Sequence, residues 1–356
     1  MNERIIYITR PDEWFDTGTE VELVDDYRPD GLNCGLFRGY RNGKLDEEIC
    51  PFDEFNIVER SDRLLIMNIA FLVFRNNLTG YGHWYRSKAL ADYLKSRGHK
   101  VTIIGDYQYS RISYVDYNSL LIENSSEMLN PTLFDHIIES WFDWIIVDLP
   151  FELDQSFYQA CKSKRVKSLI LNGIGHQVGD LADLRIVQGL GEGEYSGPDY
   201  VILRDEIIEL RHKYRLQLRF DPRKPKWFVF GGGFDPLNLG DKFIDRWLTD
   251  DFILPSEERS FLQYALECNR ACLSMGMIVW ELLTIGLKCY VFSVSPKHLE
   301  FAMRMNDAGL IRAYPEVGIP KQAEFVEFLQ SDFVVNSELI PDGKAKERIE
   351  RLIING

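Results

Sequence analysis

A long apolar run that ends in a glycine-rich turn constrains the fold of this chain more than any other feature. The run, LLIMNIAFLVF, covers residues 64–74, the turn contains Gly80 and Gly82, and a helical pattern continues through Arg97. A buried strand that leads into a helix N-terminus has this pattern. Glycines let the backbone approach a ligand closely, and the helix dipole favours anions there. The stretch therefore predicts an anion-binding turn, with His83 on the first turn of the helix.

Strand and helix patterns alternate from residue 62 to residue 210. Strands are expected at 69–74, 100–105, 144–148 and 166–171, with further helices at 131–142 and 154–163. This alternation predicts a parallel sheet with right-handed crossovers, and ligands bind outside the carboxyl ends of such strands. His83, Asp148 and His176 each fall at or just after a strand end. They are therefore candidates for one site.

A second region of the same kind covers residues 227–356. Its first strand, at 227–230, runs directly into Gly231, Gly232 and Gly233, whose backbone N–H groups can bind a diphosphate. Helices are expected at 239–248, 257–269, 278–285, 298–308, 321–329 and 344–353, with a strand at 287–291. The two regions predict an α/β protein of two Rossmann-like domains, 62–210 and 227–356, which a basic linker at 211–226 connects.

Residues 1–61 do not continue this alternation. Short alternating strands are expected at 19–24, 35–40 and 54–59, with turn-forming residues between them. They predict a small β-module, a barrel or meander that resembles an SH3-like barrel. The module is expected either to dock a macromolecular partner or to be a structural appendage of the enzyme body.

Composition excludes several classes of protein. The formal net charge of −14 disfavours nucleic acid and anionic membrane over most of the surface. No apolar run is long enough to span a bilayer, and the N-terminal residues lack the pattern of a secretion signal, so we expect a cytoplasmic protein. The six cysteines are scattered and form no ligand cluster, so no metal site is predicted.

Four blocks of the sequence resemble the GT-B superfamily of nucleotide-sugar enzymes. They are FR and GYGHWYR at 74–75 and 80–86, YVILRDE at 200–206, FGGGFD at 230–235, and SMGMIVWE at 274–281. They are most similar to the UDP-sugar hydrolase of pseudaminic acid synthesis (PseG), and more distantly to MurG-type glycosyltransferases. The segment from Gly233 to Ser274 is short for the strand–helix units that the family carries there, and residues 1–60 have no counterpart.

The first domain is expected to supply the acceptor side of the site. His83 is expected to be the general base or to hydrogen-bond a phosphate, since an imidazole ordinarily titrates close to neutral pH. Arg86, one helical turn later, is expected either to orient a diphosphate or to form a salt bridge that holds the domain together. Asp148 is expected to hold substrate or to cap a helix, and His176 to face the acceptor.

The nucleotide-sugar is expected to contact glycine turns of both domains and one helix of the second. The residues assigned to it are Gly80, Gly82, Gly231, Gly232, Gly233, Ser274, Gly276 and Glu281. The resemblance implies that Glu281 binds the ribose, and an ionised carboxylate can accept from both hydroxyls. Ser274 and Gly276 shape the phosphate loop, whereas Arg204 and Glu206 are expected to fix the hinge.

Together these features predict an enzyme that cleaves the bond between a sugar and a nucleoside diphosphate in the cleft between the two domains. The donor is expected to be a UDP-sugar, with neither a metal nor another cofactor required. Transfer to a hydroxyl of a glycan, protein or modified nucleic acid is the first interpretation. Transfer to water, as in the PseG-like hydrolase, is the second. A catalytically inactive GT-B-like protein that binds a ligand or partner is the third.

Overall fold

The structure is a computed structural model, and it divides the chain into two compact units, Met1–Leu65 and Ile66–Gly356. The residues that it describes are 5–7, 20–25, 34–41, 44–51, 66–73, 82–105, 118–121, 141–172, 181–214, 226–231, 237–246, 252–253 and 261–356.

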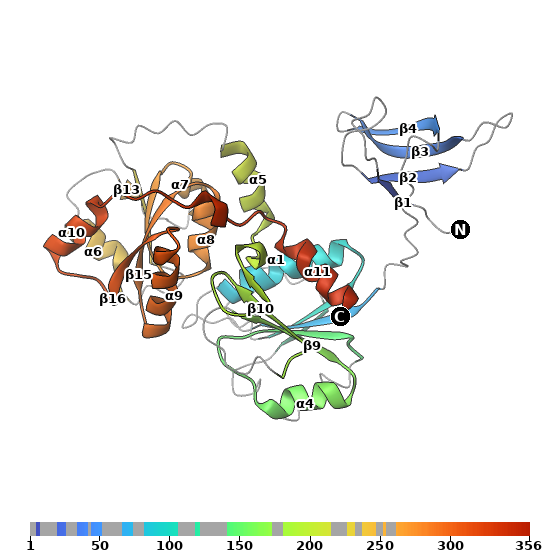
Figure 1. Cartoon of the computed structure of the whole chain (residues 1–356), viewed down its shortest axis with the longest axis horizontal. Coiled ribbons are helices and arrows are strands. Elements are labelled where there is room, and N and C mark those ends of the chain that lie inside the picture. Colours follow the sequence, from blue (N-terminus) through green and yellow to red (C-terminus); the bar gives the residue numbers. More distant parts are fainter. Residues whose placement is uncertain are drawn as a thin grey trace. The chain divides into compact units, whose positions relative to one another are not determined.

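The first unit contains a four-stranded antiparallel sheet whose strands are neighbours in chain order (Figure 1). The strands are β1 (Ile5–Tyr7), β2 (Glu20–Asp25), β3 (Cys34–Arg41) and β4 (Lys44–Pro51). This order is that of a β-meander. The strand expected at 54–59, and with it the likeness to an SH3-like barrel, lies outside the described residues.

Seven parallel strands form the first sheet of the second unit. They are β5 (Asn68–Val73), β6 (Lys100–Gly105), β7 (Asn118–Leu121), β8 (Trp144–Asp148), β9 (Lys167–Asn172), β10 (Leu184–Gln188) and β11 (Tyr195–Gly197). In β5, Phe71 packs on one face of the sheet and Leu72 on the other. Both faces are covered, which is why this strand is apolar from Ile69 to Val73. The predicted parallel α/β architecture is confirmed.

Helices cover the two faces of this sheet. Helix α1 (Gly82–Ser96) shares a hydrophobic cluster with Phe71, whereas α4 (Gln155–Ser163) shares one with Leu72. Asp154 caps α4, because its carboxylate accepts a hydrogen bond of 2.8 Å from the Ser156 N–H. The helix expected at 131–142 lies almost entirely outside the described residues.

The strand order of the first sheet fixes where a ligand can bind. The order is β11-β10-β9-β8-β5-β6-β7, so the chain winds one way from β5 through β6 and the other way from β8 onward. The crevice outside the carboxyl ends of the strands at such a reversal is the usual ligand site of doubly wound sheets. His83 lies on the helix that follows β5, and Asp148 ends β8. Both are therefore at the switch point.

A second parallel sheet has five strands in the order β13-β12-β14-β15-β16. They are β12 (Trp227–Phe230), β13 (Phe252–Ile253), β14 (Arg270–Ser274), β15 (Lys288–Ser293) and β16 (Arg312–Val317). From β12 the chain adds β13 on one side, and it then adds β14, β15 and β16 on the other side, so the switch point lies between β12 and β14. Gly231 follows the first of these strands and Ser274 ends the second, so both residues lie at a switch point.

The remaining helices of the described residues all follow β11 in the chain. They are η4 (Pro198–Tyr200), α5 (Asp205–Tyr214), α6 (Leu239–Arg246), α7 (Phe261–Ala265), α8 (Met277–Thr284), α9 (Pro296–Asp307), α10 (Gln322–Gln330), η5 (Ser337–Leu339) and α11 (Ala345–Asn355). Among the described helices, none is both long and apolar enough to cross a bilayer.

The chain crosses between the sheets earlier than expected, in the segment 201–203. Ile202 packs in the cluster of the first sheet, whereas Val201 and Leu203 pack in the cluster of the second. Each of the three is at most 2% exposed. The crossing therefore precedes the predicted linker at 211–226, of which residues 215–225 lie outside the described part.

The last helix also departs from the predicted division of domains. We expected the helix at 344–353 in the second domain, but Ile349 and Ile353 of α11 pack in the cluster of the first sheet. Figure 1 shows α11 alongside α1. Glu350 of α11 accepts a hydrogen bond of 2.8 Å from Tyr93 of α1. The end of the chain therefore stabilises the first sheet.

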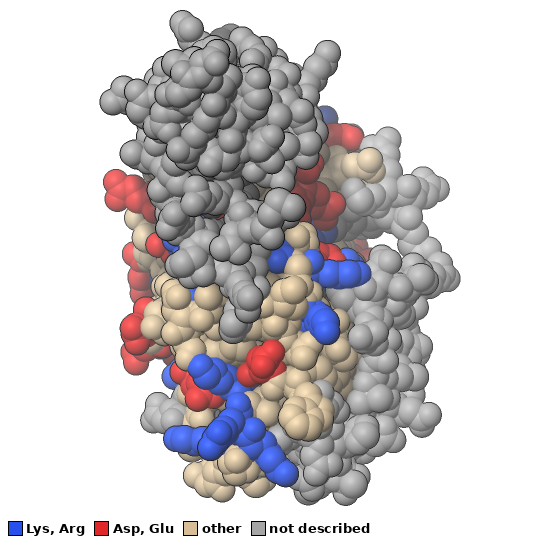
Figure 2. All heavy atoms as spheres, turned by 90° about the vertical axis from the view of Figure 1, so that its right-hand side faces the viewer, with Lys and Arg blue, Asp and Glu red and all other residues tan. Residues whose placement is uncertain are grey.

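Exposed cations gather at the end of α4 and the start of β9. Lys162, Lys164 and Arg165 are exposed, and Lys167 opens the strand. Figure 2 shows Lys and Arg side chains gathered on the lower part of the face it presents. Because β8 and β9 run in parallel, Lys167 lies at the amino ends of the strands, whereas Asp148 lies at their carboxyl ends on the opposite side of the sheet. These cations therefore do not contribute charge to the candidate site.

Candidate functional site

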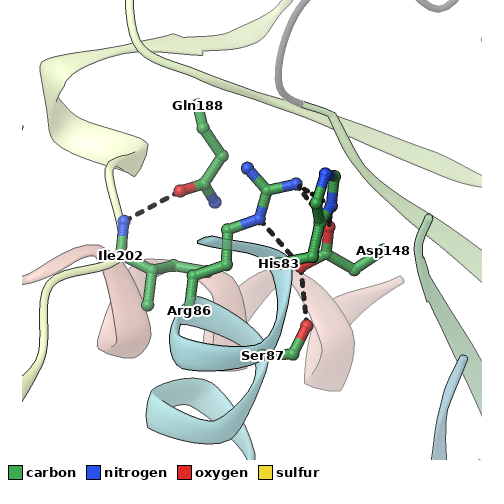
Figure 3. A network of polar contacts seen from close by, with 6 residues as sticks. All are labelled: His83, Arg86, Ser87, Asp148, Gln188 and Ile202. Carbon is green, nitrogen blue, oxygen red and sulfur yellow. Dashed lines mark hydrogen bonds and ion pairs between the residues drawn. The ribbon is translucent and has the colours of Figure 1, made fainter. Parts of the chain in front are cut away.

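A buried carboxylate holds three side chains of helix α1 at the first switch point (Figure 3). Asp148 accepts hydrogen bonds from Arg86 Nε (2.8 Å) and Ser87 Oγ (2.6 Å), and its Oδ1 lies 2.7 Å from His83 Nδ1. Arg86 Nη2 donates to the same Oδ1. His83, Arg86 and Ser87 are three and four residues apart, so they share one face of the helix. Asp148, at the end of β8, therefore holds the face of α1 that carries His83.

Asp148 is ionised in this arrangement. Its side chain is 0% exposed, and burial by itself raises the pKa of a carboxyl group. The charge and hydrogen bonds of Arg86, with those of His83, outweigh burial and lower the pKa of Asp148 well below its usual range. Arg86 is itself only 5% exposed, so the two charges compensate each other within the protein.

The contact with Asp148 determines the tautomer of His83. An ionised carboxylate can only accept, so a 2.7 Å contact requires the proton on Nδ1. Arg86 Nη2 is 2.9 Å from Nδ1 because both groups donate to the same oxygen. The lone pair of the neutral ring is then on Nε2, and 20% of the side chain is exposed. His83 is thus oriented as a base with a carboxylate behind it.

The N-termini of two helices meet next to His83. A methyl group added at Gly82, the first residue of α1, would lie 3.7 Å from Cγ of Met277, the first residue of α8. Gly276, which precedes α8, has open space where a side chain would be, and as a glycine it has no side chain with which to cap the helix. The positive ends of the two helix dipoles favour an anion at this junction.

At the second switch point, Ser274 fixes the glycine turn. Its Oγ donates a hydrogen bond of 2.6 Å to the carbonyl oxygen of Gly231, and Ser274 is 8% exposed. The hydroxyl proton is therefore engaged with the backbone. Ser274 holds the backbone at Gly231 in this arrangement, and its part in a phosphate loop stays a prediction.

Glu281 lies on α8 and is already paired. Arg204 donates to both of its oxygens, from Nε and from Nη2, each at 2.7 Å. Arg204 also donates to Glu206, and its guanidinium lies 5.3 Å from the ring centre of Tyr85 on α1. Burial raises the pKa of Glu281, although the hydrogen bonds and charge of Arg204 oppose this. Each oxygen keeps a further lone pair, so the contact with ribose stays a prediction.

The structure brings some of the predicted site residues together and does not describe others. His83, Arg86 and Asp148 come together, and Arg86 forms the salt bridge that was one of its two expected roles. Asp148 takes neither expected role among the described residues. It is fully buried, so it does not reach substrate, and it binds side chains rather than the free N–H groups of a helix. Four other predicted site residues, Gly80, His176, Gly232 and Gly233, lie outside the described residues.

Sequence reasoning missed Ser87 and the full role of Arg204. Ser87 follows His83 by four residues, a spacing that already places both on one helix face. Arg204 was expected to fix the hinge, but its bidentate pairing with Glu281 depends on contacts between distant segments. Within the described part of the chain, no group of three or more His, Cys, Asp or Glu side chains is arranged to hold a metal ion.

Comparison with known proteins identifies the fold. No family model and no curated protein matches the sequence. Among solved structures, the chain is similar to MurG of Acinetobacter baumannii, with a TM-score of 0.56, 11% identity, and coverage of 82% of this chain and 100% of the other. It is also similar to the UDP-GlcNAc 2-epimerase of Neisseria meningitidis bound to UDP-GlcNAc, with a TM-score of 0.53, 11% identity, and coverage of 82% and 100%.

A third structure agrees with these two. The UDP-GlcNAc 2-epimerase of Methanocaldococcus jannaschii in complex with UDP-GlcNAc and UDP has a TM-score of 0.50 and 8% identity, again over 82% of this chain and 100% of the other. Such low identities show the fold alone. The chain therefore has the GT-B fold, in which two parallel Rossmann-type sheets each place a switch point at the carboxyl ends of their strands.

Proposed function

We propose that this protein is a glycosyltransferase that cleaves a UDP-sugar and passes the sugar to a hydroxyl group. The observation that carries the proposal is the His83–Asp148 pair, placed at a switch point and next to the junction of two helix N-termini. A base and an anion-binding junction side by side are what transfer from a diphosphate requires.

In the proposed reaction, His83 Nε2 takes the proton of the acceptor hydroxyl. The acceptor oxygen forms a bond to C1 of the sugar, and the bond between C1 and the phosphate oxygen breaks. The diphosphate leaves with that electron pair, and the positive ends of α1 and α8 stabilise it. Asp148 keeps the imidazole in the correct tautomer and stabilises the imidazolium that forms. The Gly231 turn, which Ser274 supports, is proposed to contact the diphosphate.

Two observations support a nucleotide-sugar as the ligand. The structural neighbours of the same fold include enzymes solved with UDP-GlcNAc or UDP. In this chain, a buried carboxylate, Glu281, lies one helical turn beyond the N-terminus of α8. A diphosphate at the helix N-terminus would place the ribose near that carboxylate.

Water is the second candidate acceptor. The sequence blocks around His83 and Arg204 resemble the PseG hydrolase more closely than the transferases. The described geometry serves either acceptor, since a base oriented by Asp148 can deprotonate water or a hydroxyl.

The test combines binding with turnover. UDP binding is measured by calorimetry, and UDP-sugars are then incubated with and without glycan acceptors and the products identified by mass spectrometry. Release of free sugar without an acceptor indicates the hydrolase. No binding of any nucleotide would contradict the proposal and favour the inactive binding protein.

His83→Asn and His83→Ala test the base directly. The amide of the asparagine variant can still donate to Asp148, but it cannot take a proton. We expect both variants to lose turnover by about a hundredfold or more, with UDP affinity changed only a few-fold. Near-normal turnover of either variant would remove His83 from the chemistry.

A further inference from the structure

We propose that Arg204 is a positioning residue for nucleotide binding, which holds Glu281 ionised and oriented to accept the ribose hydroxyls. This inference rests on the proposed function, and it assigns a role in the site to a residue that sequence reasoning placed in the hinge. Three observations lead to it: the rigidity of the crossing segment, the face of α8 on which Glu281 lies, and the way Arg204 surrounds that carboxylate.

The backbone that carries Arg204 is held between the two sheets. The three residues before it alternate between the two hydrophobic clusters, with Ile202 in one and Val201 and Leu203 in the other. The Ile202 N–H also donates a hydrogen bond of 3.0 Å to Oε1 of Gln188, which ends β10 and is 1% exposed (Figure 3). A segment packed on both sides and hydrogen-bonded to a strand end cannot shift without disturbing both cores.

Glu281 lies on the face of α8 that is turned toward the junction of the two helix N-termini. It follows Met277 by four residues, so both lie on the same face of α8. Met277 is the residue that meets Gly82 at the junction of the two helix N-termini. One turn of helix rises about 5.4 Å, which places the carboxylate one turn away from the predicted diphosphate position and on its side of the helix.

Arg204 compensates a carboxylate that burial would otherwise neutralise. The Glu281 side chain is 11% exposed, and its pKa is raised because burial disfavours the charged form. Arg204 opposes that effect with two hydrogen bonds of 2.7 Å and its charge. Glu206, which shares Arg204, acts in the opposite direction. A neutral carboxyl group would accept hydrogen bonds from ribose hydroxyls less well than a carboxylate. By favouring the ionised form of Glu281, Arg204 therefore favours the form that binds ribose better.

Arg204 also connects this carboxylate to the helix of the proposed base. Its guanidinium lies over the ring of Tyr85, two residues beyond His83 on α1. The same side chain therefore contacts α1 through a ring and α8 through a salt bridge. A planar guanidinium can make both contacts at once, whereas an ammonium group cannot replace its two parallel hydrogen bonds.

The experiment compares UDP with 2′-deoxy-UDP, because only the ribose contact differs between them. A site built to hydrogen-bond a hydroxyl discriminates strongly against the analogue that lacks it. Dissociation constants for both nucleotides are measured by calorimetry at about pH 6 and about pH 8.5, because a carboxyl group with a raised pKa is protonated to a greater extent at the lower pH. At each pH, the dissociation constant for 2′-deoxy-UDP is divided by that for UDP. Titration of the terminal phosphate affects both nucleotides alike, so it cancels in this ratio.

Arg204→Met and Arg204→Lys are compared with Arg348→Met. Arg348 is the matched control, since it forms a bidentate pair with Asp342 at 2.7 and 2.6 Å but belongs to α11. We expect the wild type and Arg348→Met to prefer UDP by about tenfold or more at both pH values. We expect Arg204→Met to lose most of this preference at the lower pH and to regain part of it at the higher pH. Arg204→Lys, which keeps the charge, should lie between.

Each outcome bears on one proposal. A preference for UDP that Arg204→Met leaves unchanged at both pH values would overturn the role of Arg204. So would an equal loss in Arg348→Met, because the effect would then be one of general stability. If the wild type binds neither nucleotide, the proposed function fails. If the wild type binds both nucleotides equally, the nucleotide site remains but the ribose role of Glu281, and with it that of Arg204, is refuted.

Discussion

Asp148→Asn removes the charge that holds His83, Arg86 and Ser87 together and leaves the shape of the side chain almost unchanged. The carboxylate accepts from Arg86 Nε and Nη2, from Ser87 Oγ and from His83 Nδ1. An asparagine at this position offers one accepting oxygen, and its NH₂ group faces the remaining donors. The Arg86 guanidinium would then be a buried charge without its counter-ion.

The size of the effect follows from burial. Asp148 is 0% exposed and Arg86 is 5% exposed, so solvent screens little of their interaction. Removing one partner of a buried pair typically costs about 3–5 kcal/mol. We expect about 3 kcal/mol here, since the asparagine oxygen still accepts one or two hydrogen bonds. Such a loss lowers the melting temperature of a unit as large as Ile66–Gly356 by about 5 °C.

The assay is urea unfolding of the wild type, Asp148→Asn and the control Asp154→Asn. Asp154 caps α4 through one hydrogen bond of 2.8 Å, and asparagine is as good a cap as aspartate, so the control should change stability by less than about 0.5 kcal/mol. Because the pKa of Asp148 is lowered in the folded state, its contribution is complete above the unfolded pKa of about 3.9 and is lost as the pH falls below it. A loss of less than about 1 kcal/mol at neutral pH would refute this account of the cluster.

Two further variants test the packing that holds the site. Gly189→Ala places a methyl group 2.8 Å from ring atoms of both Trp280 and Phe301 at a φ of 99°, whereas Gly286→Ala has nearly the same φ, 98°, and open space. We expect the first to be less stable than the second by about 1–3 kcal/mol in thermal unfolding, and equal stabilities would contradict the clash. Glu350→Gln weakens the contact of α11 with α1. Although burial raises the pKa of Glu350, the imidazole of His99 3.5 Å away, the hydrogen bond from Tyr93 and the charge of Arg97 lower it to about 2. This carboxylate therefore stabilises the fold above its unfolded pKa of about 4.3, and the contribution is lost as the pH falls toward 2. Acid titrations should show that dependence in the wild type and a smaller one in the variant.

The sequence predicts elements well where the period of apolar residues is clear. The strands β5, β6, β8, β9 and β12 were expected within two residues of their observed bounds, as were α4 and α8. Apolar residues on both faces mark the central strands of a parallel sheet, and few other structures share that pattern. The glycine turn after β12 and the helix after β5 follow from the same rule.

Strands at or next to the edges of the two sheets were missed because their sequences are mixed. β10 and β11 contain charged or small residues, and the edge strand β16, RAYPEV, contains a proline. Such strands depend on pairing with a neighbour rather than on their own pattern. β14 was not predicted, because five residues do not distinguish a buried strand from a buried helix.

The position of α11 is a matter of tertiary structure. Its apolar stripe indicates a helix, and the helix was predicted. Nothing in an amphipathic pattern says which sheet the stripe will cover, so the helix was assigned to the sheet nearest in sequence. Ile349 and Ile353 instead pack with Trp144 in the first cluster. The same reasoning explains why the sequence did not predict that residues 201–203 pack against both sheets.

The charges of the site indicate how an acidic chain would bind a diphosphate. Sequence reasoning expected arginines to share that task. In the structure, Arg86 is neutralised by Asp148, and Arg204 is shared by Glu281 and Glu206. Neither therefore brings an uncompensated charge to the junction. Among the described parts of the site, the positive ends of the helix dipoles of α1 and α8 remain to favour an anion. The arginines thus maintain two ionised carboxylates, one behind the proposed base and one beside the proposed ribose.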